Sequence, residues 1–210
     1  MPQPNFLFTV PTGEPVDLTP FHFAILGQTQ YSGKTSLLKR LALWAAGLGY
    51  RVLIFDSKET EAEFSGFGTA IPVCLRPPTA SLVLIGLLES IYRPKLSRYY
   101  ATLDRVSERA KDLDEIIVEL QREERETRNS WLKDAARTLW TLLARLKEEM
   151  GKIRTVPELR LAEGISRMDI NMLSLEAQQL VVKNAFEDAL RVYKSKLVMV
   201  LDEAAKFIPQ

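Results

Sequence analysis

The feature that most constrains the fold lies between residues 21 and 38, where an apolar strand, a glycine-bearing loop and a helix are expected in succession. Residues 23–26 form an apolar run with strand character that ends at Gly27. The triplet Gly33-Lys34-Thr35 then opens an apolar-periodic segment that predicts a helix. This order is typical of a phosphate cradle. Backbone N–H groups and the positive helix end surround the phosphates, a lysine reaches the outer ones and a hydroxyl holds Mg²⁺. We therefore expect the chain to bind a nucleotide.

The loop of this cradle is longer than usual by one residue, because five residues rather than four separate Gly27 from Gly33. The half of the loop next to the lysine is intact, so the opposite half must bulge or shift. Dethiobiotin synthetase-like enzymes look similar in carrying such a longer loop. The alternative interpretation is a Gly/Ser turn before an ordinary helix. The predicted nucleotide-binding residues are Gly27, Gln28, Thr29, Gln30, Tyr31, Ser32, Gly33, Lys34, Thr35 and Ser36.

The bulk properties are those of a soluble globular protein with no redox or zinc framework. The 210 residues are 46% hydrophobic and 26% charged, enough for one sizeable domain or one domain with an insertion. A single cysteine, Cys74, excludes an internal disulfide framework and fits a cytoplasmic location. The lone histidine, His22, has no cysteine or histidine partners for a metal site. No apolar run approaches the length of a membrane span, and a net charge of +1 gives no global nucleic-acid footprint.

The segments that follow the first helix predict a mostly parallel α/β sheet. Residues 1–20 are a proline-rich lead-in with a possible short hairpin. Residues 50–55 form a second strand that stops at Asp56, residues 71–75 a candidate third strand, and residues 81–92 an apolar helix. Ligands of such sheets bind at the carboxyl ends of the strands, where Asp56 lies. The alternative for Asp56 is that it only forms a turn.

The middle of the chain, residues 95–150, has a different composition. Apolar residues recur at three- and four-residue steps in two runs, separated by polar residues near Asn129. This pattern predicts two long antiparallel helices inserted into the α/β domain. Arginines in this region are candidates for nucleic-acid contacts, but acidic residues are interleaved with them and favour a solvated helical face. These arginines are Arg105, Arg109, Arg122, Arg125 and Arg128.

The last part of the chain supplies the second half of an ATPase. A strand over 165–173 and a helix to about Tyr193 precede the apolar strand 196–201, which runs into Asp202 and Glu203. An aspartate at such a strand end steadies Mg²⁺ through its water shell, and the adjacent glutamate can take a proton from the attacking water. We assign Lys34 to the β- and γ-phosphates, Thr35 to Mg²⁺, Asp202 to the Mg²⁺-bound water and Glu203 to the catalytic base.

Several segments together resemble the motor domain of the HerA/FtsK superfamily, most closely the HerA-like and VirD4/TraG-like ATPases. These segments are AILGQTQYSGKTSLL, YRVLIFDSKE, MDINMLSLEAQQLVV and LVMVLDEAAKFIP, in that order along the chain. The resemblance covers roughly 21–92 and 161–210. It implies a RecA-like P-loop NTPase fold that uses ATP and Mg²⁺. It also implies a hexameric motor that pumps duplex DNA through its ring. A nuclease or another protein is a candidate further partner.

The same resemblance sets the expected organisation of the chain. We expect a lead-in at 1–20, a first part of the P-loop core at 21–92, a helical insertion at 93–160 and a second part of the core at 161–210. In this fold a further strand normally lies between the Asp-Glu strand and the P-loop strand, and it would carry a sensor residue. Only a few residues follow Glu203, so we expect this chain to be the front part of a longer protein. Two alternatives remain: a small-molecule P-loop ligase or kinase, and a nucleotide-binding module whose helical arm recruits a partner.

Overall fold

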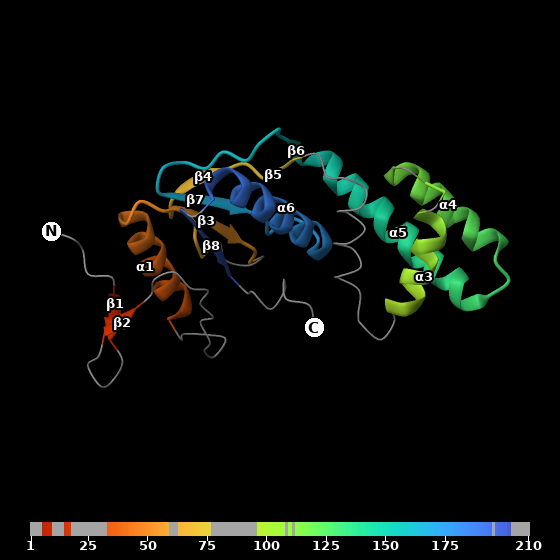
Figure 1. Ribbon diagram of the computed structural model, residues 1–210, viewed down its shortest axis with the longest axis horizontal. Helices are drawn as coiled ribbons and strands as arrows, with labels where there is room; N and C mark the ends of the chain where they lie inside the picture. Colours follow the sequence, from red (N-terminus) through yellow and green to blue (C-terminus); the bar gives the residue numbers. More distant parts are fainter. Residues whose placement is uncertain are drawn as a thin grey trace.

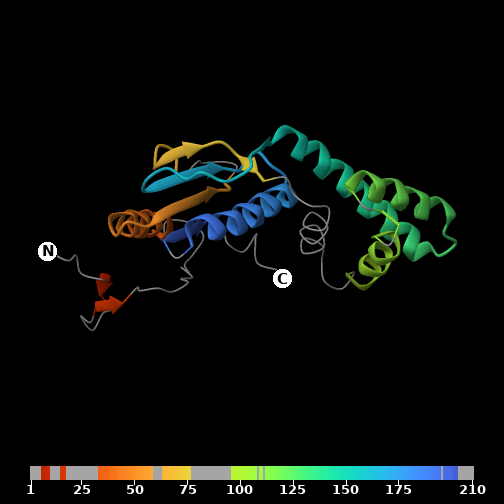
Figure 2. The same ribbon diagram turned by 45° about the horizontal axis from the view of Figure 1, so that its top comes forward.

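The computed structural model describes residues 6–9, 15–17, 33–58, 63–76, 96–107, 109–110, 112–194 and 196–202. Within these ranges the chain forms a parallel sheet with a helix on each face, and a helical unit that extends to one side (Figures 1 and 2). The expected strand at 23–26, the loop from Gly27 to Ser32, the helix at 81–92 and the chain from Glu203 onward lie outside the described residues.

The main sheet has four parallel strands in the order β4-β7-β3-β8. Their bounds are β4 Thr69–Ile71, β7 Ile165–Asp169, β3 Arg51–Asp56 and β8 Leu197–Leu201. The register pairs Asp56 with Asp169 on one side of β3 and Phe55 with Leu201 on the other. Because the strands are parallel, their carboxyl ends meet along one edge, and the predicted α/β class is confirmed.

The two faces of the sheet are covered by α1 (Lys34–Gly47) and α6 (Leu175–Tyr193), as Figure 2 shows. Alternate residues of β3 point to opposite faces. Val52 and Ile54 pack in the cluster that contains Ala42 and Ala45 of α1. Leu53 and Phe55 pack in the cluster that contains the buried face of α6. A strand buried on both faces reads as a continuous apolar run, which is why the sequence of β3 shows no alternation.

The helical unit contains three helices: α3 (Leu96–Ser107), α4 (Leu113–Glu126) and α5 (Ser130–Lys152). The predicted helical hairpin corresponds to α4 and α5, which Asn129 separates by accepting from the N–H groups of Trp131 and Leu132. The first long helix expected from the periodicity differs from the structure, because it is divided into α3 and α4. Asp112 explains the restart, since its side chain caps α4 by accepting from the N–H of Glu115 at 2.9 Å.

The core of the helical unit is apolar and is shared with α6. Buried leucines from all three helices meet there, namely Leu103, Leu120, Leu139, Leu143 and Leu146. Ala177 and Leu180, from the beginning of α6, are buried in the same cluster. The unit is therefore packed against the end of the α/β part where α6 begins. Within the described ranges, no helix combines the length and apolarity that a membrane span requires.

Two smaller sheets complete the described strands. β1 (Phe6–Thr9) and β2 (Pro15–Asp17) pair antiparallel, which confirms the predicted hairpin. β5 (Cys74–Leu75) pairs in parallel with β6 (Arg154–Thr155). The prediction of one strand over 71–75 was wrong: β4 ends at Ile71, and β5 belongs to a different sheet. Pro72 follows Ile71 and has no N–H to donate, so it does not continue the ladder.

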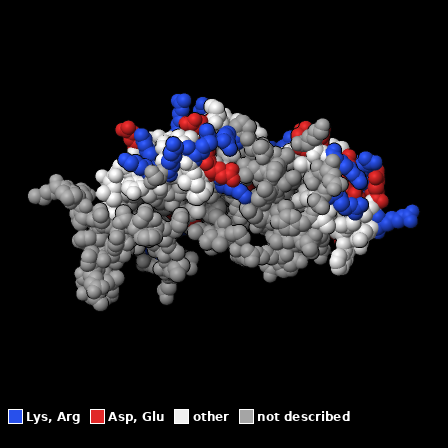
Figure 3. All heavy atoms as spheres, in the orientation of Figure 1, with Lys and Arg blue, Asp and Glu red and all other residues white. Residues whose placement is uncertain are grey.

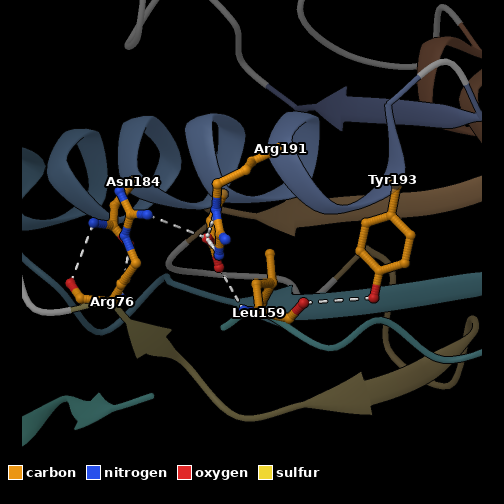
Figure 4. A network of polar contacts seen from close by, with 6 residues as sticks. Arg76, Leu159, Asn184, Arg191 and Tyr193 are labelled. Carbon is orange, nitrogen blue, oxygen red and sulfur yellow. Dashed lines mark hydrogen bonds and ion pairs between the residues drawn. The ribbon is translucent and has the colours of Figure 1, made fainter. Parts of the chain in front are cut away.

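A polar network attaches the chain around Leu159 to α6 (Figure 4). Asp188, 1% exposed, accepts from the N–H of Leu159 and from Arg191 at 2.7 Å, and its carboxylate lies 3.8 Å from Arg76. Tyr193 on the same helix accepts from the N–H of Leu161 at 2.8 Å. These bonds satisfy backbone groups of an irregular segment that would otherwise be buried without partners.

Candidate functional site

The first turn of α1 carries the predicted phosphate-binding residues Lys34, Thr35 and Ser36. Gly33 precedes the helix with φ +73°, a left-handed conformation that glycine adopts without steric cost. This first turn contains no acidic side chain, as is also true of α3 and α5, whereas α4 and α6 begin with acidic residues. The initial N–H groups of a helix lack partners within the helix, and its N-terminus is positive. The start of α1 is therefore suited to an anion.

The ends of β3 and β8 place two carboxylates on the same edge of the sheet. Asp56 is the last residue of β3 and Asp202 follows β8 directly; they are 0% and 6% exposed. The Ser57 hydroxyl, also buried, donates to the backbone oxygen of Asp202 at 3.2 Å and ties the two strand ends together. Both carboxylates thus lie where parallel sheets bind their ligands.

A chain of polar contacts connects the start of α1 to the end of β8. The Thr35 hydroxyl donates to one carboxylate oxygen of Glu63, and Lys58 donates to the other. Lys58 Nζ lies 3.9 Å from Asp202 Oδ2. Thr35 and Asp202, which come from the two ends of the described core, are therefore brought into one cluster.

Glu63 is held in this cluster by the residue that follows it. The Phe64 side chain is fully buried beside α1 and β3. Its N–H donates to Asp56 Oδ2 at 3.3 Å, and its carbonyl accepts from Arg167 of β7. Lys39 Nζ lies 5.6 Å from the centre of the Phe64 ring, within the range of a cation–π contact. Phe64 thus fixes the turn that presents Glu63 to Thr35.

The pKa values of Asp56 and Glu63, the two acidic residues next to Phe64, are shifted in opposite directions. Burial raises the pKa of the Asp56 carboxyl and outweighs the hydrogen bond from the Phe64 N–H, which lowers it. The nearby Asp169 adds to the rise, and the Lys58 N–H and Arg167 oppose it with smaller contributions. Partial burial would also raise the pKa of Glu63. The hydrogen bonds from Lys58 and Thr35, with the charges of Lys58 and Lys39, outweigh burial and lower this pKa overall. Glu63 is therefore a carboxylate at neutral pH.

The oxygen groups in this cluster fit Mg²⁺. Mg²⁺ prefers oxygen ligands and is usually bound by one or two protein groups together with phosphates and water. The Thr35 hydroxyl and the Asp202 carboxylate supply such groups on either side of the cluster. Among the described residues, no group of three or more acidic, histidine or cysteine side chains is arranged to hold a metal. A metal here would thus complete its coordination with the nucleotide and water.

The described part of the chain contains only some of the predicted site residues. Thr35 and Asp202 belong to the polar cluster at the carboxyl edge of the sheet, and Gly33, Lys34 and Ser36 are neighbours of Thr35 in the chain at the start of α1. The remaining loop residues, from Gly27 to Ser32, and Glu203 lie outside the described residues.

Lys58 and Glu63 are not among the site residues predicted from the sequence. The signal for them is the acidic stretch SKETEAEF, which begins at the carboxyl end of β3.

The arginines that were considered for nucleic acid are largely occupied. Arg105 lies 3.1 Å from Glu123, and Arg122 lies 3.0 Å from Glu126. Arg109 lies 4.0 Å from Glu119. The helical end of the molecule accordingly shows Lys and Arg beside Asp and Glu on the face in view (Figure 3). This arrangement favours the interpretation of a solvated surface with paired charges.

Comparison with known proteins bears on the fold. No protein-family model matches the sequence, and no curated protein matches it either. The structure is similar to that of VirB4 of Thermoanaerobacter pseudethanolicus, with a TM-score of 0.51 and 14% sequence identity. The match covers 83% of this chain and 82% of the VirB4 chain. At this identity the similarity concerns the fold alone: the chain is an α/β protein whose architecture is similar to that of the VirB4 chain.

Proposed function

We propose that this chain binds ATP with Mg²⁺ at the carboxyl edge of its sheet and hydrolyses it, as the motor domain of a translocase-type ATPase. One observation carries the proposal. The start of α1, with Thr35, and the end of β8, with Asp202, share one polar cluster through Glu63 and Lys58. A nucleotide-hydrolysing P-loop protein needs these two segments to meet around one triphosphate.

The roles of the residues follow from their chemistry. Lys34 would contact the β- and γ-phosphates, and the N–H groups of the first turn of α1 would bind phosphate oxygens. Thr35 and Asp202 would hold Mg²⁺, the former directly and the latter through a bound water. When bound, Mg²⁺ would neutralise part of the negative charge of the phosphates. Glu203 would accept the proton of the attacking water.

The experiment that tests this proposal compares Lys34→Ala with Glu203→Gln. Lys34→Ala should remove nucleotide affinity, because it deletes the cation that faces the outer phosphates. Glu203→Gln should keep the affinity of the wild type and stop turnover, because the amide cannot take the proton. Nucleotide binding is measured by calorimetry and turnover by phosphate release. Equal loss of binding in both variants would contradict the role of Glu203, and binding that is insensitive to Lys34→Ala would contradict the site.

The finer part of the proposal is a HerA-like motor, a cytoplasmic hexameric ring that moves duplex DNA. It is supported by the sequence resemblance, and the predicted division into a core at 21–92 and 161–210 with an insertion at 93–160 belongs to it. An ATPase rate that rises with duplex DNA and falls steeply with salt would support this part. Turnover that requires a small metabolite would instead indicate a ligase or kinase. Binding without turnover, unchanged by DNA, would indicate a regulatory module.

A further inference from the structure

The contact between Thr35 and Glu63 has a chemical consequence for the hydroxyl. A threonine hydroxyl has one proton to donate and two lone pairs. In the structure the proton is directed to the Glu63 carboxylate. Both lone pairs then remain available to a cation, and donation of the proton makes the oxygen a better electron donor. Groups that orient a metal ligand in this way commonly decide how tightly the metal binds.

The surroundings of Glu63 keep it in this position. Its second carboxylate oxygen accepts from Lys58, whose ammonium also lies 3.9 Å from Asp202. The Glu63 and Lys58 side chains are 22% and 23% exposed, so the pair is partly shielded from solvent. Behind Glu63, the buried Phe64 is held by the Asp56 carboxylate and by Arg167. The carboxylate is therefore fixed from both sides.

We infer that Glu63, fixed by Lys58, is a positioning residue for Mg²⁺ binding at this site. It turns the Thr35 hydroxyl so that its lone pairs face the metal of a bound nucleotide. Lys58, by contacting both Glu63 and Asp202, keeps the two metal-facing groups on the same side of the cluster. The inference rests on the proposed function, because it assumes that Mg²⁺ with a nucleotide is the ligand.

A purely structural role makes a different prediction. A carboxylate close to a helix N-terminus stabilises the helix whether or not a ligand is present. Loss of such a role would lower the stability of the protein and leave the effect of Mg²⁺ on nucleotide affinity unchanged. The positioning role predicts instead that the increase in nucleotide affinity caused by Mg²⁺ becomes smaller when Glu63 is replaced.

The test measures the affinity of the 210-residue chain for a fluorescent ATP analogue, with Mg²⁺ and with EDTA, in wild type and Glu63→Ala. With Mg²⁺ the variant should bind about 10- to 100-fold more weakly, the usual effect of removing a group that orients a metal ligand. With EDTA the two proteins should bind equally. Glu63→Gln keeps an acceptor for Thr35 but loses the charge that holds Lys58, so its affinity with Mg²⁺ should be intermediate. If the alanine variant does not fold, the affinity of the glutamine variant with Mg²⁺ and with EDTA tests the positioning role.

The matched control is Glu124→Ala in the helical unit. Glu124 also accepts with both carboxylate oxygens, from Arg137 at 2.7 Å and from Trp140 at 2.6 Å, but it lies outside the cluster. Its removal should leave both affinities unchanged. If the Glu63 variants keep the Mg²⁺ dependence of the wild type, or bind more tightly with Mg²⁺, the positioning role is overturned and the proposed function stands. If the wild type does not bind the analogue with Mg²⁺, both are overturned.

Discussion

Replacing Gly33 by alanine should destabilise the protein even though the new methyl group has room. A Cβ atom built at Gly33 meets no atom within 4 Å, so no clash contributes. The destabilisation comes from the backbone, because an L-residue held at φ +73° raises the free energy of the folded state by about 1–2 kcal/mol. Alanine also lowers the conformational entropy of the unfolded chain, and this opposing effect stabilises the folded protein by about 0.4–1 kcal/mol. The free energy of unfolding should therefore fall by about 1 kcal/mol.

Two other glycines serve as controls for this calculation. Gly47, the last residue of α1, is not in the left-handed region and also has open space, so Gly47→Ala should raise the free energy of unfolding by about 0.5 kcal/mol. Gly68 combines φ +76° with a blocked position, because a Cβ atom would lie 2.7 Å from Ile165 Cγ2 and 2.9 Å from the Ile165 carbonyl oxygen. Crowding of this kind adds about 1–3 kcal/mol, so Gly68→Ala should cost about 3 kcal/mol in total.

The assay is urea unfolding followed by circular dichroism. With a slope of about 2 kcal/mol per molar urea, the midpoint should fall by about 0.5 M for Gly33→Ala and by about 1.5 M for Gly68→Ala. It should rise by about 0.25 M for Gly47→Ala. The sign difference between the two ends of α1 is the decisive result. A Gly33→Ala protein that is as stable as Gly47→Ala would refute the left-handed start of the helix.

Two further predictions concern buried carboxylates. The raised pKa of Asp56 means that the folded protein holds this proton more tightly than the unfolded chain. Its stabilising contribution is therefore full below the unfolded value of 3.8 and is lost as pH rises through the native value. Relative to the wild type, Asp56→Asn should gain stability as pH rises from acid to neutral. The free energy of unfolding of both proteins is measured in urea at several pH values. A difference between them that stays constant with pH would contradict the raised pKa. Asp188→Ala should cost about 3 kcal/mol, because the Leu159 N–H loses its buried acceptor. Nucleotide affinity should be unchanged, because Asp188 is on α6 and its partners Leu159, Arg191 and Arg76 do not belong to the cluster of Thr35 and Asp202. A fall of less than about 1 kcal/mol in the free energy of unfolding, measured in urea, would contradict the network.

The core of the fold could be predicted because its signals are local. The buried strands β3 and β8 are continuous apolar runs, and α6 begins at Ser174, whose side chain caps the helix by accepting from the N–H of Ala177 at 3.4 Å. The short strands were not predictable in the same way. β4 forms because it pairs with β7, and β5 because it pairs with β6, a segment far away in the chain. The residues 71–75 themselves give no signal that they pair with β7 and β6.

The sequence predicts site residues where residue type and position together indicate a chemistry. A Gly-Lys-Thr triplet before a helix and an aspartate after a buried strand are each modest signals, and only their combination in one chain predicts a nucleotide site. Of the residues so predicted, Thr35 and Asp202 share one polar cluster. Glu63 was not predictable, because Glu59, Glu61 and Glu63 are equivalent in the sequence pattern. The contact of Glu63 with Thr35 follows from the burial of the neighbouring Phe64, and that burial depends on the tertiary packing of α1 against β3.

The shared core of the helical unit determines how a mechanical load on that unit would travel. Ala177 and Leu180 anchor the beginning of α6 among the leucines of α3, α4 and α5, while the following turns of α6 are buried against the sheet. A pull on the helical unit therefore reaches the strands through a packed helix as well as through the covalent connection. Excision of residues 96–152 would expose Ala177 and Leu180 in the first turns of α6, so we expect the α/β part to be less stable without the three helices.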